Sequence, residues 1–258
     1  MPEQSLPLLA VLIDADNTSP RHAGAIFEEI ASFGEASVRR AYGDFSSNQM
    51  SGWNKVQSEH GIVPLHSPAY TVGKNSSDIS LVIDAMDLLH AGRFDGFVLV
   101  SSDSDFTRLA SRIREQGLDV YGIGQKKTPE AFRKVCKRFI FLENIGSPTP
   151  APKPTPPGEP PVNAPGPKPE PAPVIAAPKP PAAPLAEARD IILRAMDAIG
   201  EDEEWFALGP LGQYITAANP DFDTRTYGRK KLSDLVQDLK VFETKRGAAN
   251  QLLIRRLD

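Results

Sequence analysis

The 258-residue sequence contains a single cysteine, Cys136, and no apolar run that approaches the roughly 20 residues needed to cross a bilayer. One cysteine forms no internal disulfide and supplies no thiolate cluster for zinc. We therefore expect a reducing, cytoplasmic location and no membrane partner. An excess of one charge is also missing, because 29 Lys and Arg residues face 33 Asp and Glu residues, for a net charge of −4. Any nucleic-acid binding must therefore come from local basic patches.

Proline is scarce everywhere except in one segment. Of the 25 prolines, 17 lie in the 38 residues between Ser147 and Pro184. Such a segment forms neither a helix nor the interior of a sheet, because proline lacks the backbone N–H and has a fixed φ angle. We therefore predict a first domain over residues 1–146, a disordered linker over 147–184 and a small second domain over 185–258.

The first domain alternates short apolar segments with amphipathic ones. The apolar segments predict six strands, at residues 8–13, 37–42, 62–66, 97–100, 120–123 and 139–142. Apolar residues at helical spacing predict helices at 22–33, 78–90, 106–116 and 129–137. In the second helix we expect the core-facing side to comprise Ile79, Val82, Ile83 and Met86. The alternation predicts an α/β fold, with a mostly parallel sheet that has helices on both faces.

Carboxylates follow the predicted strands at the edge of the sheet where ligands bind in such folds. Two acidic residues follow each of two strands and two more lie on the middle helix: Asp14, Asp16, Asp103, Asp105, Asp78 and Asp84. Neighbouring carboxylates repel each other unless they share a cation or take up protons. Oxygen ligands without histidine or cysteine favour Mg²⁺ or Mn²⁺ over zinc. A single Asp after a strand is commonly a helix cap instead, and that interpretation stays open for Asp103 and Asp105.

Three of these segments resemble motifs of a known family. The stretches LIDADN (12–17), KNSSDISLVIDA (74–85) and VSSDSDF (100–106) are similar to the acidic motifs of the NYN domain, a PIN-like ribonuclease family. The resemblance covers about residues 8–144 and implies a metal-dependent ribonuclease fold. It implies that the metal is held by Asp14, Asp78 and Asp103, with Asp105 or Asp84 in support. Asn17, and with less weight Asp16, would then contact the substrate or a ligand carboxylate, although Asn17 is also a turn-forming residue.

Two other functions stay open. The segment from Asp14 to Thr18 also fits the Asp-x-Asp-x-Thr pattern of haloacid-dehalogenase-type phosphatases, in which the first Asp attacks phosphorus and the second, here Asp16, is the general acid or base. That interpretation gives Asp78 no role, and it places the phosphate-binding serine, Ser101, on the same strand end as an Asp pair. The second alternative is a non-catalytic adaptor that binds RNA or protein. An adaptor, however, has no need of a metal cluster.

Basic residues are concentrated between positions 126 and 138, where six basic side chains accompany one acidic residue. On a helix they form a stripe, which is either a phosphate-binding surface beside the carboxylates or an ordinary solvated face. From this stripe and from the second motif we select the candidate substrate contacts Lys74, Lys126, Lys127 and Arg133.

The second domain has the pattern of a winged helix-turn-helix. Helices are predicted at 186–199, 208–218 and 225–239, followed by a hairpin of residues 241–244 and 251–256. Trp205, Phe222, the Tyr-Gly-Arg-Lys-Lys segment 227–231 and the terminal Leu-Ile-Arg-Arg resemble the OST-HTH (LOTUS) domain. The resemblance implies binding of RNA, or docking of a protein partner. The candidate phosphate contacts are Arg225, Arg229, Lys230 and Lys231.

Together these observations predict a metal-dependent ribonuclease that acts in RNA processing or turnover. The winged-helix module would recruit RNA, and the linker would raise the effective concentration of that RNA near the carboxylates.

Overall fold

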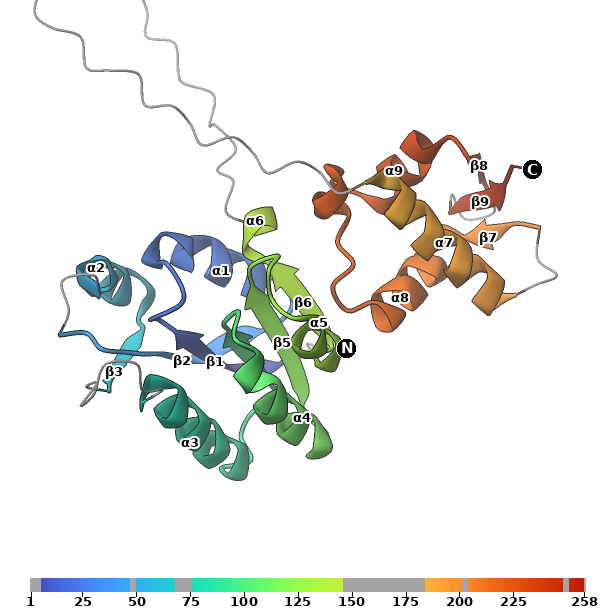
Figure 1. Ribbon diagram of the computed structural model, residues 1–258. Helices are drawn as coiled ribbons and strands as arrows, with labels where there is room; N and C mark the ends of the chain where they lie inside the picture. The colour runs from blue at the N-terminus through green and yellow to red at the C-terminus, as the bar shows by residue number, and fades with distance from the viewer. Residues whose placement is uncertain are drawn as a thin grey trace, which may run out of the picture.

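The computed structural model describes residues 6–46, 50–67, 76–145, 184–200, 204–247 and 251–257. They form an α/β part up to residue 145 and a smaller, mainly helical part from residue 184 (Figure 1). Apart from Pro184, the predicted linker lies outside the described residues. Among the helices that are described, none is long and apolar enough to span a membrane.

A six-stranded, fully parallel sheet in the order β3-β2-β1-β4-β5-β6 forms the centre of the α/β part. Its strands are β1 (Leu8–Asp14), β2 (Glu35–Gly43), β3 (Val63–His66), β4 (Gly96–Val100), β5 (Asp119–Gly124) and β6 (Arg138–Phe141). Each predicted strand is confirmed to within two residues. The central strands β1 and β4 are almost entirely buried, as expected for parallel strands that are covered on both faces.

Alternate side chains of β1 point into two separate cores. Leu9, Val11 and Ile13 pack under α1 (Ala23–Ile30), α2 (Ser51–His60) and α6 (Leu142–Ile145). Ala10 and Leu12 pack against α3 (Ser76–His90), α4 (Thr107–Glu115) and α5 (Glu130–Val135). Short 3₁₀ helices, η1 (Pro20–His22) and η3 (Ser104–Phe106), precede α1 and α4. The predicted α/β architecture is therefore confirmed.

Two expectations about helices were wrong. Helix α3 buries Leu81, Ala85, Leu88 and Leu89. Val82 and Met86 pack against this core as expected, whereas Ile79 is 60% exposed and Ile83 58% exposed. The helix carries apolar residues on two sides, so spacing alone did not identify the side that packs on the sheet. Helix α2 was not predicted at all, because Trp53 is the one side chain that it buries.

The C-terminal part contains α7 (Leu185–Ile199), α8 (Leu208–Ala218), η4 (Thr224–Tyr227) and α9 (Leu232–Leu239). A three-stranded sheet follows the order β7-β9-β8, made of β7 (Phe206–Ala207), β8 (Phe242–Arg246) and β9 (Leu252–Arg256). The predicted helix over 225–239 is interrupted, because Gly228 at φ 76° ends η4 and the chain becomes helical again only at Leu232. Strand β7, with two residues, is too short to show a sequence pattern.

Candidate active site

Asp14, at the end of β1, has a side chain that surrounding groups hold in place. It is 1% exposed and accepts hydrogen bonds from the Ser101 hydroxyl at 2.7 Å, the Asn17 side-chain amide at 3.0 Å and the Asn17 backbone N–H at 3.2 Å. Burial raises the pKa of Asp14, and the three hydrogen bonds partly offset this effect. Asn17 thus contacts a carboxylate, which was one of its two expected roles.

Ser101 is a positioning residue. From the sequence, its one expected role was to bind phosphate in a phosphatase. It follows β4, is 2% exposed, donates to Asp14 Oδ2, and accepts a hydrogen bond from the Asp103 backbone N–H at 3.1 Å. One hydroxyl therefore joins the acidic ends of two adjacent parallel strands. A small hydroxyl residue directly after a buried strand was the signal that could have identified it.

Asp103 and Asp105 lie at the start of η3. The Asp103 side chain caps this helix through Oδ1, which accepts a hydrogen bond from the Asp105 backbone N–H at 2.9 Å. The capping interpretation of Asp103 is therefore confirmed, and it occupies only one of the two carboxylate oxygens. The Asp105 side chain is exposed.

Asp78, in the first turn of α3, is affected by the charges of four other motif carboxylates. Its pKa is raised to about 6, first by burial and then by the negative charges of Asp14, Asp103, Asp16 and Asp105. Four carboxylates that lie at or after the ends of β1 and β4 are therefore close enough to Asp78 for their charges to act on it. Asp16 is exposed, and its Oδ1 accepts a hydrogen bond from the backbone N–H of Asp44 at 3.2 Å.

The chemistry of this region suits a hard divalent cation. Every ionisable member is a carboxylate, and a cation among them would relieve the repulsion that raises the Asp78 pKa. The side chains are not yet gathered into a coordination shell: within the described ranges, no three His, Cys, Asp or Glu residues are placed to hold one ion together. The site thus has suitable donors and potential, but not ligands in position.

Asp84, also expected near the metal, lies elsewhere. It forms an ion pair with Arg40 and a hydrogen bond with the Tyr42 hydroxyl, both on β2. Burial and this carboxylate raise the pKa of Tyr42. Asp84 is six residues beyond Asp78, about 9 Å along the helix, and it is not among the charges that raise the Asp78 pKa. The contacts of Asp84 anchor α3 to the sheet.

Among the basic residues predicted to contact substrate in the α/β domain, Lys126 and Lys127 lie close to the carboxyl edge of the sheet. The backbone N–H of Lys126 donates to Glu143 at 3.0 Å, and the side chain of Lys127 is exposed. The Ser102 hydroxyl accepts a hydrogen bond from the Gln125 N–H at 2.8 Å, which ties this loop to the end of β4. Lys74 lies outside the described residues.

The arginines chosen as phosphate contacts already have acidic partners. Arg133 pairs with Asp221, Arg225 with Glu29 and Asp223, and Arg229 with Asp238. Lys230 and Lys231 are exposed. Phosphate is therefore more accessible to the two lysines than to the three arginines.

Cys136 and the aromatic residues behave mainly as packing groups. Cys136 is 1% exposed, and burial raises the pKa of its thiol to about 12. Tyr227 is buried and packs with Phe222. Trp205 differs, because Lys245 Nζ lies 3.6 Å and the Arg255 guanidinium 4.8 Å from the centre of its ring.

Comparison with known proteins agrees with the motifs. The NYN domain model matches residues 8–143, and the OST-HTH/LOTUS domain model matches residues 179–254. Among solved structures, a protein of unknown function from Vibrio parahaemolyticus aligns with 55% of this chain and 96% of its own, at 18% identity and a TM-score of 0.47. An uncharacterized protein from Nitrosomonas europaea aligns with 35% of this chain and 90% of its own, at 34% identity and a TM-score of 0.27.

A search of curated proteins gives no match. The NYN model alone covers more than half of the chain. The chain therefore belongs to the NYN domain family of PIN-like nucleases, and its NYN domain is followed by an RNA-binding domain of the OST-HTH/LOTUS type.

Proposed function

We propose that the protein is a metal-dependent ribonuclease that acts in RNA processing or turnover in the cytoplasm, with Mg²⁺ or Mn²⁺ as its cofactor. The observation that supports this most strongly is the raised pKa of Asp78 in the field of four neighbouring carboxylates. A carboxylate cluster of this kind lowers its free energy by binding a divalent cation. The residues that would hold the ion are Asp14, Asp78 and Asp103, with Asp105 in support.

The bound ion would supply Lewis-acid chemistry, by activating water and offsetting charge on the phosphate. The chain itself positions the reactants. Ser101 and Asn17 fix the Asp14 carboxylate, so its orientation is set before any ligand arrives. Lys126 and Lys127 follow β5, next to the end of β4, and are suited to contact the phosphate and offset charge on the leaving oxygen.

For the whole chain, we infer a catalytic domain over residues 1–146, a linker over 147–184 and an RNA-recruiting domain over 185–258. Exposed Lys230 and Lys231, at the start of α9, are the phosphate contacts that this surface supports best. Recruitment through a tethered module raises the local concentration of RNA at the carboxylates without requiring a basic nuclease domain.

The phosphatase alternative has less support. The phosphatase mechanism gives Asp78 no role, whereas Asp78 lies close enough to Asp14 and Asp103 for their charges to raise its pKa. For the adaptor alternative, the carboxylate cluster would be a cost to stability with no use.

The variant Asp103→Asn tests the assignment. Asparagine also caps helices, so the fold should persist, while loss of a ligand charge should lower cleavage of a labelled RNA by about 100-fold or more. The assay compares RNA, DNA and a chromogenic phosphomonoester, with and without Mn²⁺, and circular dichroism checks the fold.

The matched control is Asp87→Asn, an exposed position on α3. It should cleave like the wild type. Cleavage of RNA by Asp103→Asn at the wild-type rate would discard the metal site. Hydrolysis of the monoester instead would favour a phosphatase, and no hydrolysis of any substrate would favour an adaptor.

A further inference from the structure

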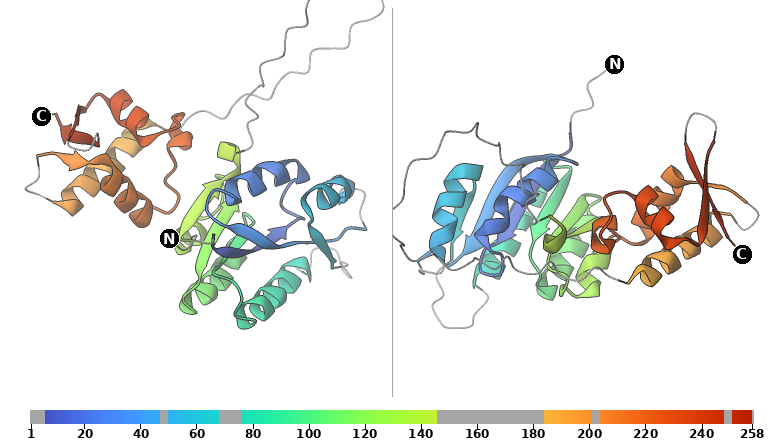
Figure 2. Two further views of the ribbon diagram at one scale, coloured as in Figure 1. Left: turned by 180° about the vertical axis from the view of Figure 1, so that it is seen from behind. Right: turned by 90° about the horizontal axis from the view of Figure 1, so that it is seen from above.

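We propose that the OST-HTH domain docks on the β6 edge of the NYN sheet and that docking hides arginines of both domains from RNA. The competition with RNA rests on the RNA-binding part of the proposed function, whereas the docking itself does not. The two domains lie side by side at β6 and α5 in Figure 1 and in both views of Figure 2.

The first support is a pair of hydrogen bonds, one from β6 and one from α6, the helix that follows it. The Phe139 backbone N–H donates to the Pro220 carbonyl at 2.8 Å, and the Asn144 side-chain amide donates to the Thr226 hydroxyl at 2.8 Å. Because β6 is the last strand of the sheet, its outward N–H groups need a partner other than a strand. The segment between α8 and η4 supplies one.

The second support is a set of ion pairs across the same boundary. Glu29 on α1, with a side chain 13% exposed, accepts hydrogen bonds from both terminal nitrogens of Arg225 at 2.8 and 3.1 Å, and one from Arg138 at 3.0 Å. Arg133 on α5 pairs with Asp221 of the OST-HTH domain. A two-nitrogen arginine–carboxylate contact is directional, so these pairs fix how the domains meet as well as holding them together.

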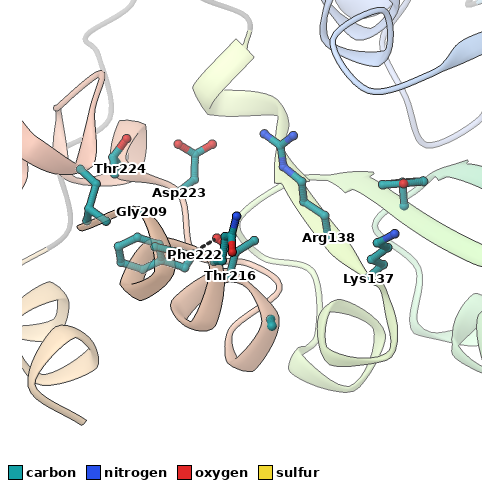
Figure 3. Close-up of a pocket in the computed structure, with 12 residues that line it drawn as sticks. Lys137, Arg138, Gly209, Thr216, Phe222, Asp223 and Thr224 are labelled. Atoms are coloured by element: carbon teal, nitrogen blue, oxygen red, sulfur yellow. Dashed lines mark hydrogen bonds between the residues drawn. The ribbon is translucent and has the colours of Figure 1, made fainter. Parts of the chain in front are cut away.

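Polar contacts join the two domains around an incompletely packed space, which favours a reversible junction. A cavity of about 740 Å³ lies between the two domains (Figure 3). Its lining includes Lys137 and Arg138 of the NYN domain and Thr216, Phe222, Asp223 and Thr224 of the OST-HTH domain. Interfaces built from charge pairs around such a space are typical of separable partners rather than of a permanent core. The docked state is therefore one that a competing ligand can displace.

RNA phosphate is such a ligand, because it requires the same guanidinium groups. In the docked state Arg133 and Arg225 are neutralised, and the carboxylates of Asp221 and Glu29 repel an approaching phosphate. Separation of the domains frees Arg133 from Asp221 and Arg225 from Glu29, and leaves Arg225 with Asp223 of its own domain as its acidic partner. Since the two equilibria share these groups, docking must weaken RNA binding by the same factor by which RNA weakens docking.

A reversible cross-link tests this in the full-length protein. The side chains of Asn144 and Thr226 touch across the boundary, so Asn144→Cys with Thr226→Cys should form a disulfide on oxidation. The native Cys136 is buried, and its raised pKa of about 12 keeps it from competing. In EDTA, which prevents cleavage, the oxidised protein should bind a 20-nucleotide single-stranded RNA about tenfold more weakly than the reduced protein. RNA should slow cross-linking by a comparable factor.

A second pair of variants uses no cross-link. Glu29→Gln with Asp221→Asn should strengthen RNA binding several-fold, and the charge-matched control Asp87→Asn with Asp197→Asn, at exposed positions, should do so much less. Absence of the disulfide would overturn the docking. Equal RNA affinity of the oxidised and reduced forms, or no RNA binding by either, would overturn the competition. Failure of the wild type to cleave RNA with Mn²⁺ would discard the nuclease and leave the competition intact.

Discussion

At the scale of single residues, the candidate site combines two different carboxylates. Hydrogen bonds fix the carboxylate of Asp14, whereas burial and neighbouring negative charges disfavour the charged form of Asp78. Burial raises the pKa of Asp14, and three hydrogen bonds to its carboxylate offset part of that effect. Asp78 has four negative neighbours that raise its pKa, and among the described residues no hydrogen bond to its side chain is found. Asp78 is therefore the carboxylate of the site that is most disfavoured in its charged form.

This cost predicts that Asp78→Asn stabilises the metal-free protein at neutral pH. The folded-state pKa of about 6 lies above the unfolded value of 3.8, so the stability that protonated Asp78 contributes is present below pH 3.8 and is lost as the pH rises through 6. With allowance for solvent screening of a half-buried carboxyl, the gain at pH 7.5 should be about 1 kcal/mol.

Urea denaturation in EDTA at pH 7.5 and at pH 4 measures this effect. The difference between variant and wild type should shrink to near zero at pH 4, and Asp87→Asn on the same helix should show no such pH dependence. A variant that is less stable than the wild type at pH 7.5 would show that the carboxylates do not repel one another as described.

The residues of the site differ in how far sequence alone predicts them. Asp14 and Asp103 follow strands, so a parallel sheet places them at one edge whatever the details of packing. The place of Ser101 directly after a buried strand marks it locally, but its hydrogen bond to Asp14, across 87 residues of sequence, follows from no local pattern. Asp84 shares the motif of Asp78, but helix geometry directs it to Arg40 instead.

At the scale of helices and strands, local patterns predict the sheet better than the helices. Strands β1, β4, β5 and β6 are short and mostly apolar with clear ends, whereas α3 has two apolar sides and α2 has barely one. The break at Gly228 depends on a left-handed backbone conformation. Glycine permits this conformation, but its presence in the sequence does not show that the conformation is adopted. The sides that helices bury depend on packing against the assembled sheet, which cannot be read from the sequence of one helix.

The anchoring of α3 predicts that Asp84→Asn affects stability more than catalysis. The variant removes the charge that pairs with Arg40, whose side chain is 31% exposed, and leaves that cation poorly compensated. We expect a loss of about 2 kcal/mol in the free energy of unfolding, with metal-dependent cleavage near the wild-type rate at a temperature where the variant is folded. Urea denaturation and the RNA assay measure the two quantities. Lost cleavage without lost stability would instead assign Asp84 to the metal.

At the scale of the whole molecule, ion pairs between the two domains determine which basic side chains are available to RNA. Both parts are slightly acidic in sequence, and two of the three arginines expected to bind phosphate, Arg133 and Arg225, pair across the boundary instead. The Glu29–Arg225 pair joins residues 196 positions apart, so only the assembled structure reveals it. The sequence therefore predicted the two folded parts but not the contact between them.

The account as a whole depends on the carboxylate cluster binding a divalent ion. Calorimetric titration of Mn²⁺ into the full-length wild type, with Asp14→Asn as the comparison, tests this most directly. We predict saturable uptake of one or two ions by the wild type, and affinity about tenfold or more lower in the variant, since the fixed carboxylate is lost. Absence of Mn²⁺ and Mg²⁺ uptake by the wild type, or equal uptake by the variant, would contradict the metal-dependent mechanism.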